Sequence, residues 1–438
     1  MSKKAIAAPE GATPSTTGAA DGLLDFIYPD PADAISFQPA SIGQMKEDAI
    51  VFLDTNVLLL PYNTGKNSLV DIVRIYSDLI EQGRLVIPAR VMQEFLKNSP
   101  DRLKEVFQKL SRQRNLNVPV ESYPVLENVA EYTEFLNARK ELVDQVKNFQ
   151  QKLGKLVSLI QDWHHDDPVR QAYAKIFRAG EIVKLEPEAT AAVSKESAFR
   201  YENKIPPGYK DGAKDDGGIG DLLIWKTILQ VAMKRSKHAI FVCGEEKADW
   251  WHRSENQPLM VRHELIDEYR RASGGKTFRL LDMGDFLELF GAKKSVVQEV
   301  KEEQKTLAVS AQNAQRFGFE AERAVYNWLA KRGEGTVVVK QHGADFEVKS
   351  ANGNTLVDVK LGRPLGVGKR VVDCYQRALK LRQMGEVFSN YMIVFVSENE
   401  QIASRVASEI PTWAPQVADW ILMTCGFLDE AGNFIPVA

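Results

Sequence analysis

Four acidic residues in the first two thirds of the chain stand at or near the edges of predicted strands and helices: Asp54, Glu94, Asp221 and Glu245. Asp54, for example, directly follows the apolar run 49–53, which predicts a short buried strand. Open α/β sheets build their sites at the carboxyl ends of such strands. The four positions therefore predict one acidic site at a single sheet edge.

Carboxylates that converge in this way repel one another unless cations lie among them. Hard oxygen ligands suit Mg²⁺ or Mn²⁺. Two such ions can activate a water molecule and stabilise the leaving oxygen of a phosphodiester. The chemistry predicted from these residue types is metal-dependent cleavage of nucleic acid.

Each position also has a plainer interpretation. Asp54 can cap the helix that follows it, Glu94 can belong to a solvated helix face, and Asp221 can complement the dipole of the helix it opens. One such residue is weak evidence for a site. The four together favour the metal-binding interpretation.

The surrounding motifs resemble those of the large PIN-like domains of bacteria, over roughly residues 45–290. The matching residues are Asp54-Thr55-Asn56, Ile87-Pro88 with Glu94, Pro206–Asp211 leading to Gly220–Trp225, Phe241-Val242 with Lys247, and Asp249-Trp250-Trp251. The resemblance implies a PIN-type parallel sheet. It also implies metal-dependent ribonuclease activity carried by Asp54, Glu94 and Asp221.

The chain departs from this family at the fourth acidic position. The family usually has Asp there, and this chain has Glu245. The extra methylene moves the carboxylate, although glutamate still binds a metal ion. Two acidic neighbours, Glu246 and Asp249, compete with Glu245 for the same role.

A second acidic group is predicted in the last part of the chain. Asp345 lies in one predicted strand, and Asp358 and Lys360 lie in the next, across a turn at residues 352–354. Alternation along a strand puts Asp358 and Lys360 on the same face. The two aspartates can then hold a metal ion while the lysine orients or activates water. The alternative is a plain hairpin whose Asp and Lys side chains alternate outward.

The predicted order of elements here, helix-strand-strand-strand-helix-strand, resembles the PD-(D/E)xK restriction-endonuclease-like superfamily. The resemblance covers about the last quarter of the chain, and the Pro that precedes the first Asp of the motif is Ala344 here. It implies a further carboxylate on the leading amphipathic helix 317–331, at Glu320.

A basic run follows the second acidic group, between Lys360 and Arg382. It includes Arg363, Lys369, Arg370 and Arg377. The chain has a net charge of −3, so nucleic-acid binding requires local basic patches or metal ions. We interpret the run as a phosphate-binding surface, with a merely solvated face as the alternative.

Composition indicates a globular intracellular protein. The chain has 438 residues, of which 44% are hydrophobic and 26% charged, enough for two or three cores. Its three cysteines show no CxxC spacing, which favours a reducing compartment and argues against zinc sites. No apolar run has the length of a membrane span or of a signal-peptide core. We therefore expect no membrane partner and a cytoplasmic location.

The chain is predicted to have four parts. The first is a flexible arm at 1–47, which is irregular from residue 23 on. The second is a PIN-like domain at 48–290 with a long helical insertion at about 101–200. A helical linker at 291–315 and a restriction-endonuclease-like α/β domain at 316–438 follow.

The insertion carries an apolar stripe with alternating spacings of four and three: Leu142, Val146, Phe149, Leu153, Leu156, Ile160 and Trp163. Packing within a helical hairpin is the favoured interpretation. Binding of a partner protein or a second copy is the alternative. The cluster 164–167 that follows, His-His-Asp-Asp, is predicted to be exposed rather than metal-binding.

The acidic patterns predict a metal-dependent endonuclease, and the two resemblances imply that it has a ribonuclease site and a second nuclease site acting on DNA or RNA. The resemblances suggest a bacterial defence or toxin-type effector. The alternative is a nucleic-acid-binding or assembly protein in which one or both sites are inactive.

Overall fold

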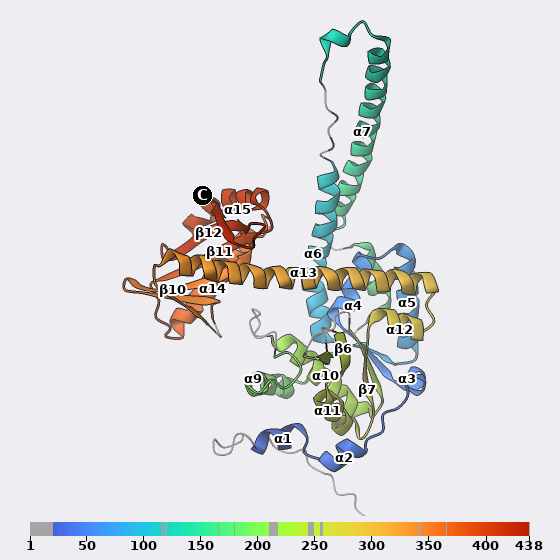
Figure 1. Cartoon of the computed structure of the whole chain (residues 1–438). Coiled ribbons are helices and arrows are strands. Elements are labelled where there is room, and N and C mark those ends of the chain that lie inside the picture. Colours follow the sequence, from blue (N-terminus) through green and yellow to red (C-terminus); the bar gives the residue numbers. More distant parts are fainter. Residues whose placement is uncertain are drawn as a thin grey trace, which may run out of the picture. The chain divides into compact units, whose positions relative to one another are not determined.

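The computed structural model describes residues 21–437 except 115, 117, 119–120, 165, 179, 210–217, 244–248, 255–256, 341–342 and 365. The chain divides into two compact units, Met1–Lys305 and Thr306–Ala438. Within the described ranges, every helix is too short or too polar to span a bilayer. Figure 1 shows the elements of both units.

The first unit contains a five-stranded sheet in the order β3-β2-β1-β4-β7. Its strands are β1 (Ile50–Leu53), β2 (Leu85–Pro88), β3 (Ile182–Val183), β4 (Ala239–Val242) and β7 (Phe278–Leu281). All neighbouring pairs are parallel. The strands β1, β2 and β4 are buried along their whole length, as expected of apolar runs covered on both faces. The parallel sheet expected for this part of the chain is confirmed.

The same unit also contains several helices and a small separate hairpin. They are α4 (Thr55–Leu59), η1 (Leu60–Tyr62), α5 (Lys66–Glu81), α10 (Ile219–Arg235), β5 (Trp251–Ser254), β6 (Gln257–Val261), α11 (His263–Ser273) and α12 (Met283–Leu289). Phe52, Phe241 and Trp225 are among the large fully buried side chains of the core. The sheet is thus held rigidly, which suits a site at its edge.

The region expected to be an irregular arm contains three helices. Residues 21–48 form α1 (Asp21–Ile27), α2 (Pro31–Ser36) and α3 (Ile42–Asp48). Pro31 suits the first turn of α2, and Ser41 with Gln44 forms a capping box that starts α3. Met45 of α3 is fully buried in the core. The irregular conformation expected there is wrong because local capping signals start two of the helices.

The insertion leaves the sheet along α6 (Ala89–Gln113) and returns along α7 (Ala130–Asp162), as Figure 1 shows. The remaining elements are η2 (Pro124–Leu126), α8 (Pro168–Ile176), β3 and α9 (Pro187–Glu202). The predicted insertion was entirely helical. The short strand β3 was missed because two residues are too few to show a periodic pattern. It pairs with β2 in parallel.

The second unit has a six-stranded sheet in the order β13-β12-β11-β10-β9-β8. Its elements are β8 (Thr336–Val339), β9 (Phe346–Ser350), β10 (Gly353–Leu361), α14 (Val367–Gln383), β11 (Asn390–Ser397), α15 (Glu400–Trp413), η3 (Ala414–Gln416), β12 (Ile421–Leu428) and β13 (Phe434–Val437). The pairs β10-β11 and β11-β12 are parallel, and the other three pairs are antiparallel. The helix-strand-strand-strand-helix-strand order predicted from the sequence is present.

One long helix, α13 (Lys294–Arg332), covers the predicted linker. Val296 and Val300 near its start are buried in the core of the first unit. Ala321 and Val325 near its end are buried against one face of the second sheet. The expected helix is therefore present, but its first turns belong to the first unit.

Candidate functional site

Asp54 stands at the carboxyl end of β1 and is 5% exposed. Its backbone amide donates to the Val242 carbonyl at 2.9 Å, and the Cys243 thiol lies 3.7 Å from its Oδ2. Although Asp54 precedes α4, its side chain makes no capping hydrogen bond to that helix. The simple helix-cap interpretation is therefore not supported.

Glu94, on α6, is tied to the end of β1. The Thr55 hydroxyl donates to Glu94 Oε2 at 2.8 Å, and Arg90 Nε donates to Oε1 at 2.7 Å. Because Thr55 is the neighbour of Asp54, this contact brings the second predicted carboxylate to the edge where the first one lies. Glu94 is not a freely solvated helix residue.

Asp221 lies in the first turn of α10 and is 7% exposed. Its neighbour Gly220 approaches Glu94 so closely that a Cβ there would be 2.8 Å from Glu94 Oε1. Gly218, before the helix, has φ 70°, which glycine tolerates best. The start of α10 is thereby placed against Glu94, so the structure brings Asp54, Glu94 and Asp221 to one region.

The fourth predicted position, Glu245, lies outside the described residues, as do Glu246 and Lys247. The competing Asp249 is described and is 2% exposed. Its Oδ2 accepts a hydrogen bond from the Gly208 amide at 2.6 Å. Asp249 therefore holds the backbone at Gly208.

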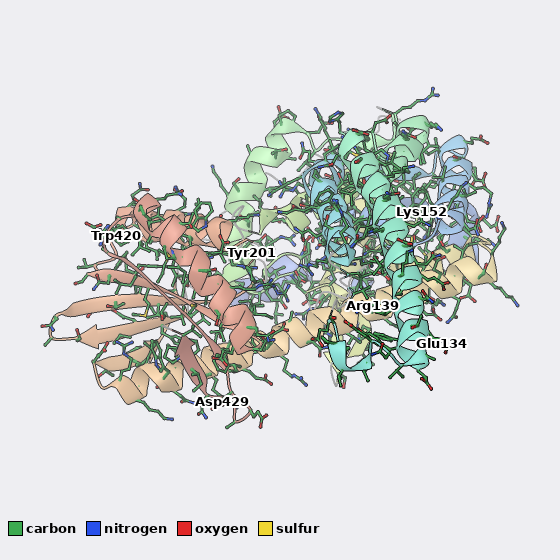
Figure 2. The ribbon with its side chains drawn as sticks, turned by 90° about the horizontal axis from the view of Figure 1, so that it is seen from above. Glu134, Arg139, Lys152, Tyr201, Trp420 and Asp429 are labelled. Atoms are coloured by element: carbon green, nitrogen blue, oxygen red, sulfur yellow. The ribbon has the colours of Figure 1, made fainter. Side chains whose placement is uncertain are left out.

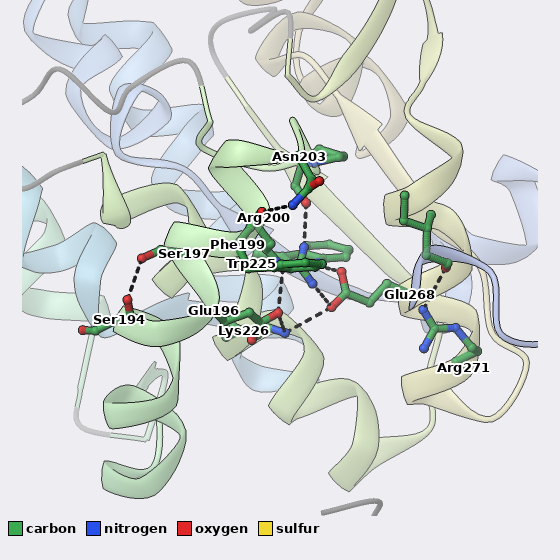
Figure 3. A network of polar contacts seen from close by, with 12 residues as sticks. Ser194, Glu196, Ser197, Phe199, Arg200, Asn203, Trp225, Lys226, Glu268 and Arg271 are labelled. Atoms are coloured by element: carbon green, nitrogen blue, oxygen red, sulfur yellow. Dashed lines mark hydrogen bonds and ion pairs between the residues drawn. The ribbon is translucent and has the colours of Figure 1, made fainter. Parts of the chain in front are cut away.

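A buried ion-pair network supports α10 one turn after Asp221 (Figure 3). Glu268 accepts from Trp225 Nε1 at 2.8 Å and Lys226 Nζ at 3.1 Å, and it pairs with Arg200 Nη2 at 2.5 Å. Burial alone would raise the pKa of Glu268, but the charges of Arg200 and Lys226 outweigh burial and lower it to about 2. Arg200 also donates to the Pro206 carbonyl at 2.7 Å. The network joins α9, α10 and α11.

Sequence reasoning missed this network because its members come from three separate helices. The one available signal was charged residues on otherwise apolar helices, such as Lys226 next to Trp225. Such a signal does not reveal which partners will meet.

In the cluster 164–167, His164 and Asp166 are exposed as expected, but Asp167 is buried. Asp167 is 1% exposed, caps α8 through the amides of Val169 and Arg170, and accepts a hydrogen bond from Tyr62 at 3.0 Å. Its capping role explains its burial. His165 of this cluster lies outside the described residues.

In the second unit, Asp358 on β10 is completely buried. Its Oδ2 lies 3.0 Å from Arg377 Nη1, 3.2 Å from Lys360 Nζ and 3.5 Å from the Cys374 thiol. Its Oδ1 has no hydrogen-bond partner among the described residues. A hairpin with outward-pointing Asp and Lys is excluded by this burial.

Asp345 comes immediately before β9, one residue outside the strand in which it was expected. Its Oδ2 accepts from the Val359 amide at 2.7 Å, which holds it beside the Asp358–Lys360 segment. Burial raises the pKa of Asp345, the positive charge of Lys360 opposes the rise, and Asp358 adds to it. Asp345, Asp358 and Lys360 therefore interact electrostatically, as their spacing predicts.

Glu320 is not placed at this group. It pairs with Arg316 at 3.6 Å, and its side chain is 45% exposed. Glu322, two residues later, faces the cluster instead: burial and the charges of Asp345 and Asp358 raise its pKa, while Lys360 opposes the rise. Side chains two positions apart on a helix point in directions that differ by about 200°. Which of the two faces the cluster therefore depends on how the helix is turned when it packs.

The basic run divides into two kinds of residue. Arg363 and Lys369 are exposed, and Arg370 is partly buried with Nη1 3.4 Å from the Arg363 carbonyl. Arg377 instead pairs with the buried Asp358. The run is thus only partly a surface for phosphates.

In the parts of the chain that the structure describes, no three His, Cys, Asp or Glu side chains are placed to hold one ion together. The donor chemistry nevertheless fits a hard cation. In the first unit, the donors would be the carboxylates of Asp54, Glu94 and Asp221, and in the second unit the buried Asp358 Oδ1 has unused acceptor capacity.

The model of a family described as PIN-like domain matches residues 50–265 of the chain. Neither a curated protein nor a solved structure matches the chain. The matched region includes Asp54, Glu94 and Asp221, and its parallel sheet with surrounding helices fits a PIN-like domain. The match supports the PIN-like part of the prediction, and with it a nuclease-type function that uses divalent metal and acts on nucleic acid. It ends before the second unit begins.

Proposed function

We propose that the first unit is a divalent-metal-dependent endonuclease site acting on RNA. The observation that carries this proposal is the meeting of three separate segments: Thr55 beside Asp54 contacts Glu94, and Gly220 beside Asp221 contacts the same carboxylate. Asp54, Glu94 and Asp221 would hold Mg²⁺ or Mn²⁺, together with Glu245. The bound ion would supply Lewis-acid stabilisation of phosphate charge and an activated water.

The protein's own groups keep this site in place. Arg90 and Thr55 orient the two oxygens of Glu94. Arg200 holds the Pro206 carbonyl, and Asp249 holds the Gly208 amide. Preorganised ligands of this kind reduce the reorganisation needed when charge develops on the substrate.

For the second unit we propose a nuclease site made by Asp345, Asp358 and Lys360, with Glu322 rather than Glu320 from the helix. The two aspartates and the glutamate would hold the metal, and Lys360 would orient the water. The exposed Arg363 and Lys369, with Arg370, would bind phosphates of DNA or RNA.

One observation favours the alternative that this second site binds nucleic acid without cutting it. Arg377 and Lys360 already provide two positive charges within 3.2 Å of Asp358 Oδ2. A carboxylate balanced in this way has a weaker need for a metal ion.

A role in bacterial defence or as a toxin-type effector is proposed from the resemblance alone. The three cysteines are buried and free, which supports the proposal of a reducing, cytoplasmic compartment.

The test is cleavage of labelled RNA and DNA by the full chain with Mg²⁺, Mn²⁺ or EDTA. We expect Asp54→Asn to lower RNA cleavage at least about 100-fold, because even residues outside the metal ligands of such sites cost 10–100-fold. Asp358→Asn should leave that activity intact and remove any separate DNA cleavage. The exposed Asp101→Asn is the matched control.

Cleavage of RNA at the parent rate by Asp54→Asn would contradict the first site, and cleavage of DNA at the parent rate by Asp358→Asn would contradict the second. Binding without cleavage in every metal would leave a nucleic-acid-binding protein.

A further inference from the structure

A row of apolar side chains lies exposed along α7. Phe135, Leu142, Phe149 and Leu156 follow one another at every seventh position, and they are 49%, 52%, 42% and 49% exposed. A spacing of seven keeps side chains on one side of a helix through several turns. Such a row is the pattern that a second helix requires for coiled-coil packing.

This row is separate from the side of α7 that packs within the hairpin. The less exposed positions at spacings of four and three include Tyr132, Val146, Leu153 and Val157. Leu153 and Val157 are only 4% and 5% exposed. The stripe predicted from the sequence therefore divides: Val146 and Leu153 lie on the covered side, whereas Leu142, Phe149 and Leu156 are left without cover.

The charges beside the exposed row change sign along the helix. On the flank away from the covered side, Glu134 and Glu141 lie in the first half and Lys152 and Lys155 in the second half. All four are exposed, and none makes an ion pair with another described residue. Figure 2 shows Glu134 toward one end of α7 and Lys152 farther along it.

We propose that α7 pairs antiparallel with α7 of a second copy of this chain. In that arrangement Phe135 faces Leu156 of the other copy, and Leu142 faces Phe149. Glu134 then lies within a turn of Lys155 of the other copy, and Glu141 within a turn of Lys152. A two-fold axis brings the same flank of both helices together, so every acidic residue meets a basic one.

A parallel pairing is disfavoured by the same charges. In a parallel two-fold pair, each flank of the row meets the opposite flank of the partner, so the charges of one copy would face the side of the other copy near its covered residues, and the acidic residues would lose their basic partners. The charge pattern therefore selects both the partner, a second copy, and its orientation. This inference does not depend on the proposed nuclease function.

The first test measures the mass of the full chain in solution by sedimentation at micromolar concentrations. We expect a dimer for the parent. Glu134→Lys with Glu141→Lys, and separately Lys152→Glu with Lys155→Glu, should each weaken the dimer at least about tenfold, because all facing charges then become alike. Mixing the two variants should restore a dimer.

The control reverses two lysines on the opposite side of the same helix, Lys140→Glu with Lys147→Glu, and should leave the dimer unchanged. The proposal would be overturned if the parent were monomeric, if the charge-reversal variants dimerised as tightly as the parent, or if the mixture of the two variants stayed monomeric. Because all substituted positions are exposed, circular dichroism should show unchanged helix content.

A second test reports the orientation. Gln145 lies near the centre of the proposed pair, so Gln145→Cys should form a disulfide-linked dimer under mild oxidation. Ala138→Cys should not, because its counterpart lies far along the antiparallel partner. Crosslinking at both positions would show a parallel pair, and crosslinking at neither would exclude this face.

Discussion

The two units place positive charge differently around their carboxylates. In the second unit, two cations contact a site residue directly, with Arg377 and Lys360 at 3.0 and 3.2 Å from the buried Asp358. In the first unit, Arg90 also contacts a site residue, at 2.7 Å from Glu94 Oε1, but that pair is partly exposed. A second, buried network of Arg200, Lys226 and Glu268 lies one helical turn beyond Asp221. There, buried cations hold the helix that carries the site.

This difference has consequences for function. A fully buried carboxylate that is paired with two protein cations is stable without a metal ion. A partly exposed pair such as Arg90–Glu94 contributes much less. The family match at residues 50–265 makes the first unit the stronger candidate for metal-dependent cleavage. The second combines the residues of a nuclease site with an internal charge balance that also suits binding.

The largest expected effect tests that internal balance. Arg377→Ala should destabilise the second unit by about 3 kcal/mol, because it removes one partner of a fully buried carboxylate while Lys360 remains. The corresponding change in the first unit, Arg90→Ala, should cost only about 0.5–1 kcal/mol, because the Arg90–Glu94 pair is partly exposed. Hydrogen exchange of peptides covering β10 and β1 measures each unit separately. Equal costs would remove the contrast between the units.

A second prediction concerns acid and the supporting network. The folded-state pKa of Glu268 is about 2, below its ordinary 4.5, so its stabilising effect is complete above about pH 4.5 and is lost as the pH falls toward 2. The effect is about 3 kcal/mol. In denaturant titrations, Glu268→Gln should therefore be less stable than the parent at pH 5, with the gap closing toward pH 2. Exposed Glu202→Gln should show no such gap, and a gap independent of pH would contradict the assignment.

A third prediction tests the close approach in the first unit. Gly220→Ala introduces a Cβ 2.8 Å from Glu94 Oε1, so one of the two groups must move. We expect the rate of RNA cleavage to fall about tenfold or more, because changes that shift a metal-ligating side chain commonly cost this much activity. The same change at Gly154 in α7 meets open space and serves as the control. Full activity of Gly220→Ala would show that Glu94 is not held in place by this contact.

The smallest effect concerns phosphate contacts in the second unit. Lys369→Ala and Arg363→Ala should each flatten the dependence of log Kd on log salt by roughly one. Exposed Lys380→Ala, outside the proposed contact, should leave the slope unchanged. Filter binding over a range of salt concentrations measures these slopes. A slope unaffected by either change would restrict nucleic-acid binding to the first unit.

Much of the arrangement followed from local sequence. Apolar runs ending at Asp54 and near Glu94 predicted buried parallel strands, and strand alternation predicted that Asp358 and Lys360 share a face. Both expectations depend only on backbone periodicity, which short segments carry by themselves. The contact between the segments carrying Asp54, Glu94 and Asp221 was predictable because parallel strands end at a common edge.

Other features depended on contacts between segments far apart in the sequence. The choice of Glu322 over Glu320 depended on how α13 rotates against the second sheet. The meeting of Arg200, Trp225 and Glu268 depended on three helices packing together, and the exposure of Leu142 and Phe149 on which side of α7 the hairpin covers. A sequence determines the periodicity of an element by itself, whereas the direction in which that element is turned is decided by the surfaces it packs against.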